Sequence, residues 1–234
     1  LRLSGDEVDT VQSSFLAPGA IIPSSRVLDL KNILDSMKSE DIRERVEILS
    51  SFKTRHHKTA DGAEASYEVK RLFENIVTSR PDISVKLFDH GRETAQKSVV
   101  VRIEGKKFPA EVVLLGSHLD SIAGWFSSSD APGADDNASG TATNMTVLKA
   151  IVDNDLYFDR TIEIHAYAAE EVGLVGSLDM AKKYKRDNVD VISMLQNDMN
   201  LYPAMGEDGI WIVTNDTDAD LNNDLVTFIE RYVG

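Results

Sequence analysis

Hydrophobic positions in the first third of the chain recur at helical spacing. Between residues 27 and 52 the apolar side chains fall every three or four positions, with a break near Ser39, which predicts two consecutive helices. Asp61 and Glu64 resemble a capping box, and the apolar period that follows predicts a third helix running to about Thr78. We expect these three helices to be scaffold.

From residue 83 onward, strand patterns alternate with helical patterns. The expected elements are strands at 83–88, 98–105 and 111–117, a helix at 139–152, a strand at 161–170, a helix at 176–185, strands at 191–198 and 209–215, and a helix at 218–233. The run at 111–117 is continuously apolar, which is typical of a central strand covered on both faces. Strands that alternate with helices predict an α/β protein with three α/β/α layers around a mostly parallel central sheet.

Most of the chain is expected to form one domain. No repeat, low-complexity tract or linker divides the 234 residues, which are enough for a sizeable core. Breakers at Pro18, Gly19 and Pro23 interrupt residues 1–25, which we expect to be an irregular leader or propeptide remnant. Residues 26–234 are expected to form the domain that carries the chemistry.

Composition excludes several classes of function. The chain has no cysteine, which excludes a disulfide framework, thiolate metal sites and a thiol nucleophile. Its net charge of −14 argues against nucleic acid and anionic membranes as partners. No apolar run approaches the ~20 residues that span a bilayer, and the first residues lack the pattern of a signal peptide. We expect most of the acidic surplus to be solvated surface, with some carboxylates gathered in one site.

One histidine and several carboxylates follow the predicted strands where each strand ends. In open α/β sheets, ligands bind beyond the carboxyl ends of the strands, so these side chains are expected to meet. No lysine or arginine lies in these motifs, and crowded carboxylates must protonate or bind a cation. One imidazole among carboxylates suits Zn²⁺, or Mn²⁺ or Co²⁺. The set comprises His118, Asp120, Asp135, Asp136, Glu170, Glu171 and Asp198.

The adjacent pair Glu170 and Glu171 needs a turn in the chain. Neighbouring side chains of a regular strand point to opposite faces, so both can serve one site only where the strand ends, as Gly173 would permit. One glutamate can then bind metal while the other acts as a general base in a hydrolytic reaction. Asp120 is placed to orient the imidazole of His118. The residues alone leave open which carboxylate does which job.

Four motifs together carry a family resemblance. They are GSHLDS (116–121), APGADDNASG (131–140), AYAAEEVGLVGS (166–177) and LQNDM (195–199). In this order and spacing they resemble the M28 family of dizinc peptidases, most closely its secreted bacterial leucyl aminopeptidases, and the resemblance extends from about Ile33 through Val233. It implies a zinc-exopeptidase fold of the phosphorylase/hydrolase type, peptide or protein N-termini as substrates, a preference for hydrophobic N-terminal residues, and a secreted or periplasmic location. The oligomeric state is left open, with a monomer favoured.

The resemblance also assigns metal ligands. It implies that His118 and Asp198 hold one zinc ion, that Asp136 bridges two zinc ions, and that Glu171 binds the second. The peptide bond after the bridging residue is often cis in the family, which is the Asp136–Asn137 bond here.

Two further roles concern the reaction itself. Glu170 is implied to be the general base for a metal-bridging hydroxide that attacks the first peptide carbonyl. Asp120 is implied to be the outer partner of His118, and the free α-amino group of the substrate is expected to be held at the acidic centre.

One departure from the family pattern leaves alternatives open. In the family the second zinc also takes a histidine from a later loop, whereas this chain stops at Gly234. We therefore expect a C-terminally incomplete catalytic domain that has weak activity at best on its own. The alternatives are an enzyme similar to glutaminyl cyclase with one zinc ion, or a non-catalytic binding homologue. The complete set of four ligands argues against the single-zinc alternative.

The remaining histidines match no ligand motif. His165 lies inside a predicted strand and is expected to be a core or second-layer residue, while His56 and His57 are expected to be solvated. Trp125 and Phe126 are predicted either to line the mouth of the cleft or to pack a loop.

Overall fold

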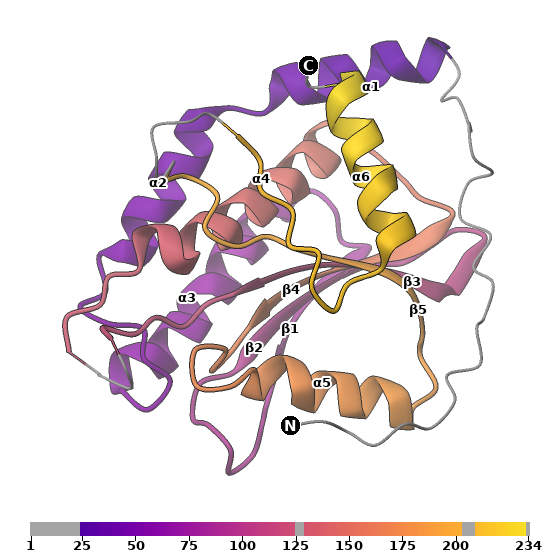
Figure 1. The fold of residues 1–234 in the computed structure, drawn as a ribbon. Helices are drawn as coiled ribbons and strands as arrows, with labels where there is room; N and C mark the ends of the chain where they lie inside the picture. The colour runs from indigo at the N-terminus through magenta and orange to yellow at the C-terminus, as the bar shows by residue number, and fades with distance from the viewer. Residues whose placement is uncertain (1–23, 125–128, 203–208, 233–234) are drawn as a thin grey trace.

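The order of elements follows the predicted alternation of helices and strands. A computed structural model describes residues 24–124, 129–202 and 209–232 (Figure 1). Its elements are α1 (Ser24–Ser36), α2 (Ser39–Ser50), α3 (Ala60–Ile76), β1 (Ile83–Phe88), β2 (Ser98–Ile103), β3 (Phe108–His118), the helical turn η1 (Ala134–Ser139), α4 (Gly140–Asp153), β4 (Arg160–Tyr167), α5 (Val175–Arg186), β5 (Asp190–Gln196) and α6 (Ala219–Tyr232). Residues 1–23 of the predicted leader, and Trp125 and Phe126, lie outside the described residues.

The five strands form one sheet in the order β1-β2-β4-β3-β5. β3 pairs in parallel with β4 and with β5, while β2 is antiparallel to both β1 and β4. Since β1 and β4 both oppose β2, four of the five strands point the same way. The carboxyl ends of β3, β4 and β5 therefore meet at one edge of the sheet.

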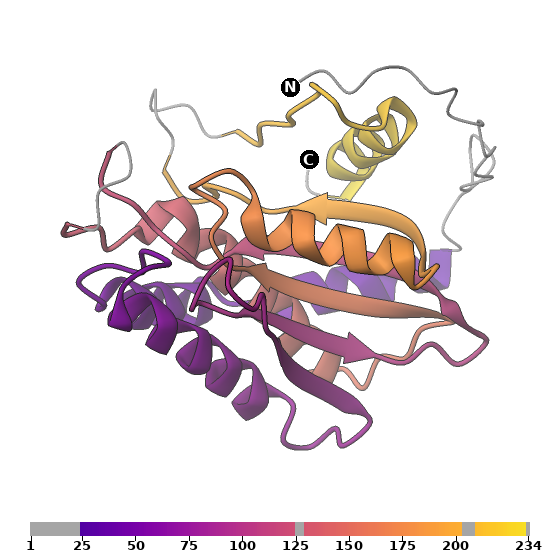
Figure 2. The same cartoon turned by 90° about the horizontal axis from the view of Figure 1, so that it is seen from below.

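Helices cover both faces of the sheet, which confirms the predicted three layers. Helix α3 contacts β1 and β2, and α4 contacts β3, with α2 packed against α4. Figure 2 shows α5 in front of the strands, on the face opposite α4, and α6 beyond the β5 edge. In the part of the chain that the structure describes, no helix combines the length and the apolar character needed to cross a bilayer.

The core lies between the sheet and α3 and α4. Alternate residues of β2 and β4 pair across the strands and point to this face, as Val101 does with Ile164. Phe73 of α3 and Leu148 of α4 are fully buried against them. This apolar layer accounts for the helical and strand periods from which the elements were predicted.

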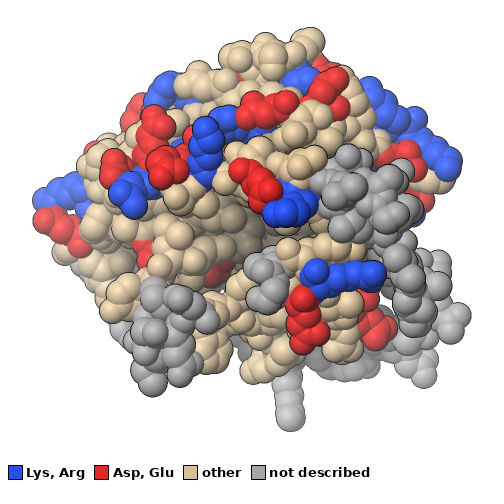
Figure 3. Space-filling view, turned by 90° about the horizontal axis from the view of Figure 1, so that it is seen from above, with Lys and Arg blue, Asp and Glu red and all other residues tan. Residues whose placement is uncertain are grey.

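Charged side chains are interspersed on the face shown in Figure 3, where acidic and basic groups lie among one another. Ion pairs also form along helices of the molecule, such as Lys31 with Asp35 on α1 and Lys149 with Asp153 on α4. Exposed pairs of this kind contribute little to stability. They fit the prediction that most of the acidic surplus is solvated surface.

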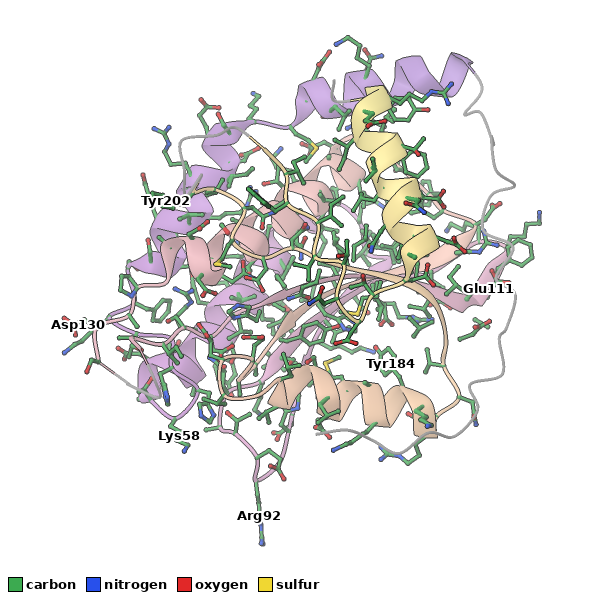
Figure 4. All side chains as sticks on the ribbon, in the orientation of Figure 1. Lys58, Arg92, Glu111, Asp130, Tyr184 and Tyr202 are labelled. Carbon is green, nitrogen blue, oxygen red and sulfur yellow. The ribbon has the colours of Figure 1, made fainter. Side chains whose placement is uncertain are left out.

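The other face of β4 carries a buried polar network beneath α5. Glu163 accepts hydrogen bonds from Arg102 at 2.7 Å and from Tyr184 of α5 at 2.5 Å, and it contacts His165 Nε2 at 2.9 Å. The side chain of Tyr184 points from α5 toward the sheet (Figure 4). His165 Nδ1 contacts the hydroxyl of Tyr167 at 3.1 Å. His165 is therefore a satisfied second-layer residue, as expected.

Because of this network, we expect the free energy of unfolding to depend on pH in the acidic range. Burial alone would raise the pKa of Glu163, but bonds from His165, Tyr184 and Arg102 lower it from 4.5 to about 2. A lowered pKa stabilises the fold above the unfolded value, and this contribution is lost as the pH falls through the folded value. We expect Glu163→Gln to cost about 2–3 kcal/mol near neutral pH. In urea unfolding, the difference from wild type should close between pH 4.5 and about 2.

Glu104 provides a matched control because it also pairs with Arg102, at 2.9 Å, but is largely exposed. Glu104→Gln should change the free energy of unfolding by less than about 1 kcal/mol. A Glu163→Gln effect of the same size as that of the control, or one that does not vary with pH, would refute this role for the network.

The strand predicted at 209–215 is wrong. Residues 209–214 are irregular, and Ile210, Trp211 and Val213 are exposed by 64%, 83% and 73%. A strand needs a partner for its backbone N–H and C=O groups, and within the described sheet β5 pairs with β3 alone. In the described part of the chain, residues 209–214 do not pair with the open edge of β5, so apolar alternation occurs here without a strand, and α6 has no buried residue among those described.

Two predicted boundaries also move. Helix α3 begins one residue before Asp61, because the hydroxyl of Thr59 accepts the N–H of Gly62 as the N-cap. Strand β4 ends at Tyr167, three residues before Glu170. The second change places both glutamates in the turn that follows the strand.

Candidate metal centre

Three side chains converge at the carboxyl edge of the sheet. His118 is the last residue of β3, Asp198 follows β5, and Asp136 lies in η1. His118 Nε2 is 3.0 Å from Asp136 Oδ1 and 3.4 Å from Asp198 Oδ1. One ligand atom from each of the three residues lies within 4.8 Å of the others. Nitrogen and carboxylate donors gathered in this way fit a zinc ion.

Asp120 supports both His118 and the glutamate turn. Its Oδ1 lies 3.4 Å from His118 Nδ1, a buried ring nitrogen that has no well-formed hydrogen bond. The two carboxylate oxygens accept the backbone N–H groups of Glu170 at 2.9 Å and Glu171 at 3.2 Å. Asp120 is fully buried, so it fixes the turn relative to the histidine. This second task of Asp120 was not anticipated from the sequence.

Hydrogen bonds between η1 and the segment after β5 bring Asp136 beside Asp198. Asn137 Nδ2 donates to the carbonyl of Asn197 at 2.9 Å. Asp135 Oδ1 accepts the N–H of Leu201, also at 2.9 Å, so this carboxylate is occupied in the loop. The Asp136–Asn137 peptide bond is cis, as the resemblance implied.

Gly140 permits this close approach at the start of α4. A Cβ atom at this position would lie 2.3 Å from the carbonyl oxygen of Asn197, which is well inside contact distance. The backbone N–H of Gly140 meanwhile donates to Asn137 Oδ1 at 2.8 Å. A side chain here would push apart the two segments that carry Asp136 and Asp198.

Glu170 and Glu171 lie in a turn that leaves the sheet after Tyr167. Ala169 has a positive φ of 52° and Gly173 a φ of 110°, so the chain reverses within a few residues. Glu170 Oε2 lies 3.9 Å from His118 Nε2, at the border of the three-ligand group. Glu171 lies outside that group in the structure.

The crowding of carboxylates shifts the pKa of several groups. Burial alone would lower the pKa of His118, but Asp120, Asp136 and Asp198 raise it to about 12. Burial, and then the charge of Asp136, raise the pKa of Glu171 to about 7. Without a cation the imidazole therefore takes a proton that partly offsets the carboxylates. A bound metal ion would displace that proton.

Glu170 has the properties of a general base. Burial raises its pKa, the charge of His118 acts against this, and the neighbouring carboxylates raise it further; these are Asp120, Asp198 and Asp136. A carboxylate with a raised pKa accepts a proton more readily than an exposed one.

Arg55 was missed by sequence reasoning. This fully buried guanidinium donates to the carbonyls of Leu119 at 2.8 Å and Gly133 at 2.9 Å, and it also binds those of Leu49 and Pro132. It thereby ties the loop after β3 to the loop that leads into η1. The segment that contains Arg55 has no hydrophobic period, and its inclusion in the family resemblance was the sole signal that pointed to it.

Arg55 also places a positive charge behind the acidic centre. Burial lowers its pKa to about 10, while the charges of Asp120, Asp136 and Glu171 favour its charged form. The guanidinium thus remains charged at neutral pH and compensates part of the negative charge that no lysine or arginine in the four motifs offsets.

His56 and His57 are buried, so the expectation that they are solvated is wrong. Both are 4% exposed. His56 Nδ1 accepts the N–H of Lys58 at 3.2 Å, and His57 Nδ1 contacts the hydroxyl of Thr94 at 3.2 Å. The segment that begins at Arg55 packs inward because the buried guanidinium binds the carbonyl of Leu119 in the loop after β3.

Comparison with known proteins places these features in a family. The profile described as Peptidase family M28 matches residues 98–232. A probable aminopeptidase of Saccharomyces cerevisiae is 37% identical over 210 residues, which are 85% of this chain and 56% of the relative. Leucine aminopeptidase 1 of Emericella nidulans is 32% identical over 87% of this chain and 55% of its own length. The chain thus spans just over half the length of these curated relatives.

A solved structure shows the same arrangement of elements. LapB from Legionella pneumophila superimposes with a TM-score of 0.81 at 28% identity, covering 90% of this chain and 56% of its own.

Proposed function

Because this chain belongs to peptidase family M28, we propose that it is the core of a zinc-dependent aminopeptidase that removes N-terminal residues from peptides. The curated relatives that match it are named aminopeptidases or leucine aminopeptidases. The observation that carries the proposal is the convergence of His118, Asp136 and Asp198 at the strand ends. The proposed substrates are peptides with a hydrophobic N-terminal residue, in keeping with the names of the leucine aminopeptidases.

His118, Asp136 and Asp198 are the residues that would hold one zinc ion. When bound, zinc lowers the pKa of water and polarises a carbonyl oxygen. In the same proposal Asp136 and Glu171 would hold a second zinc ion. The charge of Asp136 helps to raise the pKa of Glu171, as expected for two carboxylates that would share a metal ion, and this supports the proposal.

Glu170 is the proposed general base. It would take the proton from the attacking water and pass it to the amine that leaves when the first peptide bond breaks. Asp120 holds the backbone of Glu170 and faces His118, so it orients both groups. The acidic centre attracts the positively charged α-amino group of the substrate. Peptide N-termini are therefore the proposed partners, and a secreted or periplasmic location stays a prediction.

A pair of adjacent aspartates tests the proposal. Asp136→Asn should lower zinc affinity by more than about 100-fold, because it removes a ligand and not an outer partner. Asp135→Asn should leave affinity within a few-fold, because an asparagine oxygen can still accept the N–H of Leu201. Zinc binding is measured by calorimetry, and hydrolysis with leucine p-nitroanilide. Zinc-loaded wild type that hydrolyses no faster than Asp136→Asn would refute the proposed activity.

A further inference from the structure

Four consecutive backbone N–H groups in the glutamate turn are bound by side chains from other segments. Ala168 donates to Ser98 Oγ at 2.9 Å, and Ala169 donates to Gln96 Oε1 at 3.0 Å. Glu170 and Glu171 donate to the carboxylate of Asp120. The pairing of β4 with its neighbours ends at Tyr167. Beyond this residue the side-chain acceptors hold the backbone in place of a neighbouring strand.

Ser98 is itself held by a relay to α5. His90 Nε2 lies 2.8 Å from Ser98 Oγ, and His90 Nδ1 lies 2.8 Å from Asp179 Oδ2. Because a carboxylate can only accept, Nδ1 carries the proton and donates to Asp179. In the neutral ring Nε2 then accepts the hydrogen of the Ser98 hydroxyl. The hydroxyl oxygen is left to face the N–H of Ala168.

The spacing of Ser98, His90 and Asp179 is that of a serine-hydrolase triad, but Ser98 cannot act as a nucleophile here. Its side chain is fully buried at the start of β2. Its oxygen already accepts the N–H of Ala168. A nucleophile needs access to substrate and a free lone pair, so the relay orients the hydroxyl as an acceptor instead.

Gln96 is fixed from its other end. Its Nε2 group donates to the carbonyls of Arg55 at 2.9 Å and Gly62 at 3.0 Å, and the side chain is fully buried. Both donors and the oxygen of the amide are therefore used. Gln96 links the Arg55 segment directly to the turn that carries Glu170.

We propose that Ser98, His90 and Gln96 are positioning residues that hold the Glu170–Glu171 turn in register with His118. Among the described residues no strand pairs with the turn, and Ala169 has the positive φ of 52° that reverses the chain. Removal of an acceptor frees the turn to move the two glutamates relative to the metal ligands. The consequence for the reaction rests on the proposed function, whereas the fixation of the turn does not.

Hydrogen exchange of the metal-free protein tests the fixation. Ser98→Ala should speed exchange of the amides at 168–171 by about five- to tenfold, relative to amides in β2 and β4, and Gln96→Leu should act in the same direction. Ser66→Ala is the matched control, because Ser66 is also fully buried and its hydroxyl accepts the N–H of Lys97 at 2.9 Å. It should speed exchange at Lys97 and leave 168–171 unchanged.

Equal exchange at 168–171 in Ser98→Ala and Ser66→Ala would overturn the proposal, since it would reduce Ser98 to a general stabilising residue. In zinc-loaded protein, Ser98→Ala should lower kcat for leucine p-nitroanilide about tenfold or more, with KM and the affinity for the zinc ion held by His118, Asp136 and Asp198 retained. Faster exchange with an unchanged kcat would overturn the catalytic consequence alone. Wild type without hydrolysis would count against the proposed function, while the exchange result would still decide the positioning role.

Discussion

Replacement of Glu170 by glutamine is expected to reduce kcat for leucine p-nitroanilide by about 10²–10⁴-fold, the usual contribution of a general base. Glutamine keeps the size of the side chain but cannot take a proton from water. Burial and the neighbouring carboxylates raise the pKa of Glu170, so it accepts a proton more readily than an exposed glutamate would. Zinc affinity should change little, because Glu170 Oε2 lies 3.9 Å from His118 Nε2, outside the three-ligand group.

The adjacent residue provides the control. Glu171→Gln should weaken the binding of a second zinc ion, measured as metal content at saturating zinc. The affinity for the first zinc ion should change less. If Glu170→Gln loses zinc while Glu171→Gln loses only kcat, the two roles are exchanged. If Glu170→Gln retains kcat within a few-fold, the assignment of the base is wrong.

Replacement of Arg55 by methionine is expected to lower the free energy of unfolding by at least about 3 kcal/mol. The guanidinium donates to four backbone carbonyls, and a buried acceptor left without a donor costs about 1–3 kcal/mol. Zinc affinity should fall as well, because Leu119 and Gly133 lie in the loops that position the ligands. Urea unfolding and zinc titration measure the two effects.

Arg71 provides the control for this substitution. It lies on α3 with its side chain 56% exposed and pairs with Glu68 three residues before it. Arg71→Met should cost less than about 1 kcal/mol, as is usual for a surface ion pair. An Arg55→Met effect as small as that of Arg71→Met would contradict the role assigned to the buried guanidinium.

The fold was predictable wherever a pattern reports burial on one face. Helices α3 and α4 and strands β2, β3 and β4 bury apolar side chains against their neighbours, so their apolar patterns mark them. The same reasoning failed at 209–215, where alternation is present but the described sheet does not include the segment. It also misplaced His56 and His57, because burial through a single arginine leaves no period in the sequence.

The convergence of His118, Asp136 and Asp198 was predictable because the position of a residue at a strand end follows from the order of the elements. Arg55, Gln96 and His90 were not, since each acts through single contacts between segments that are distant in the chain. A lone polar residue in an irregular segment carries no local signal of the backbone group that it will meet. These three supports therefore needed the structure, whereas the convergence of His118, Asp136 and Asp198 did not.

A crystal of the zinc-soaked protein, measured at the zinc absorption edge, tests the metal centre most directly. The account predicts an anomalous peak between His118 Nε2 and the carboxylates of Asp136 and Asp198, and its absence from crystals of Asp136→Asn. A peak at other residues, or none at this edge of the sheet in wild type with saturating zinc, would contradict it.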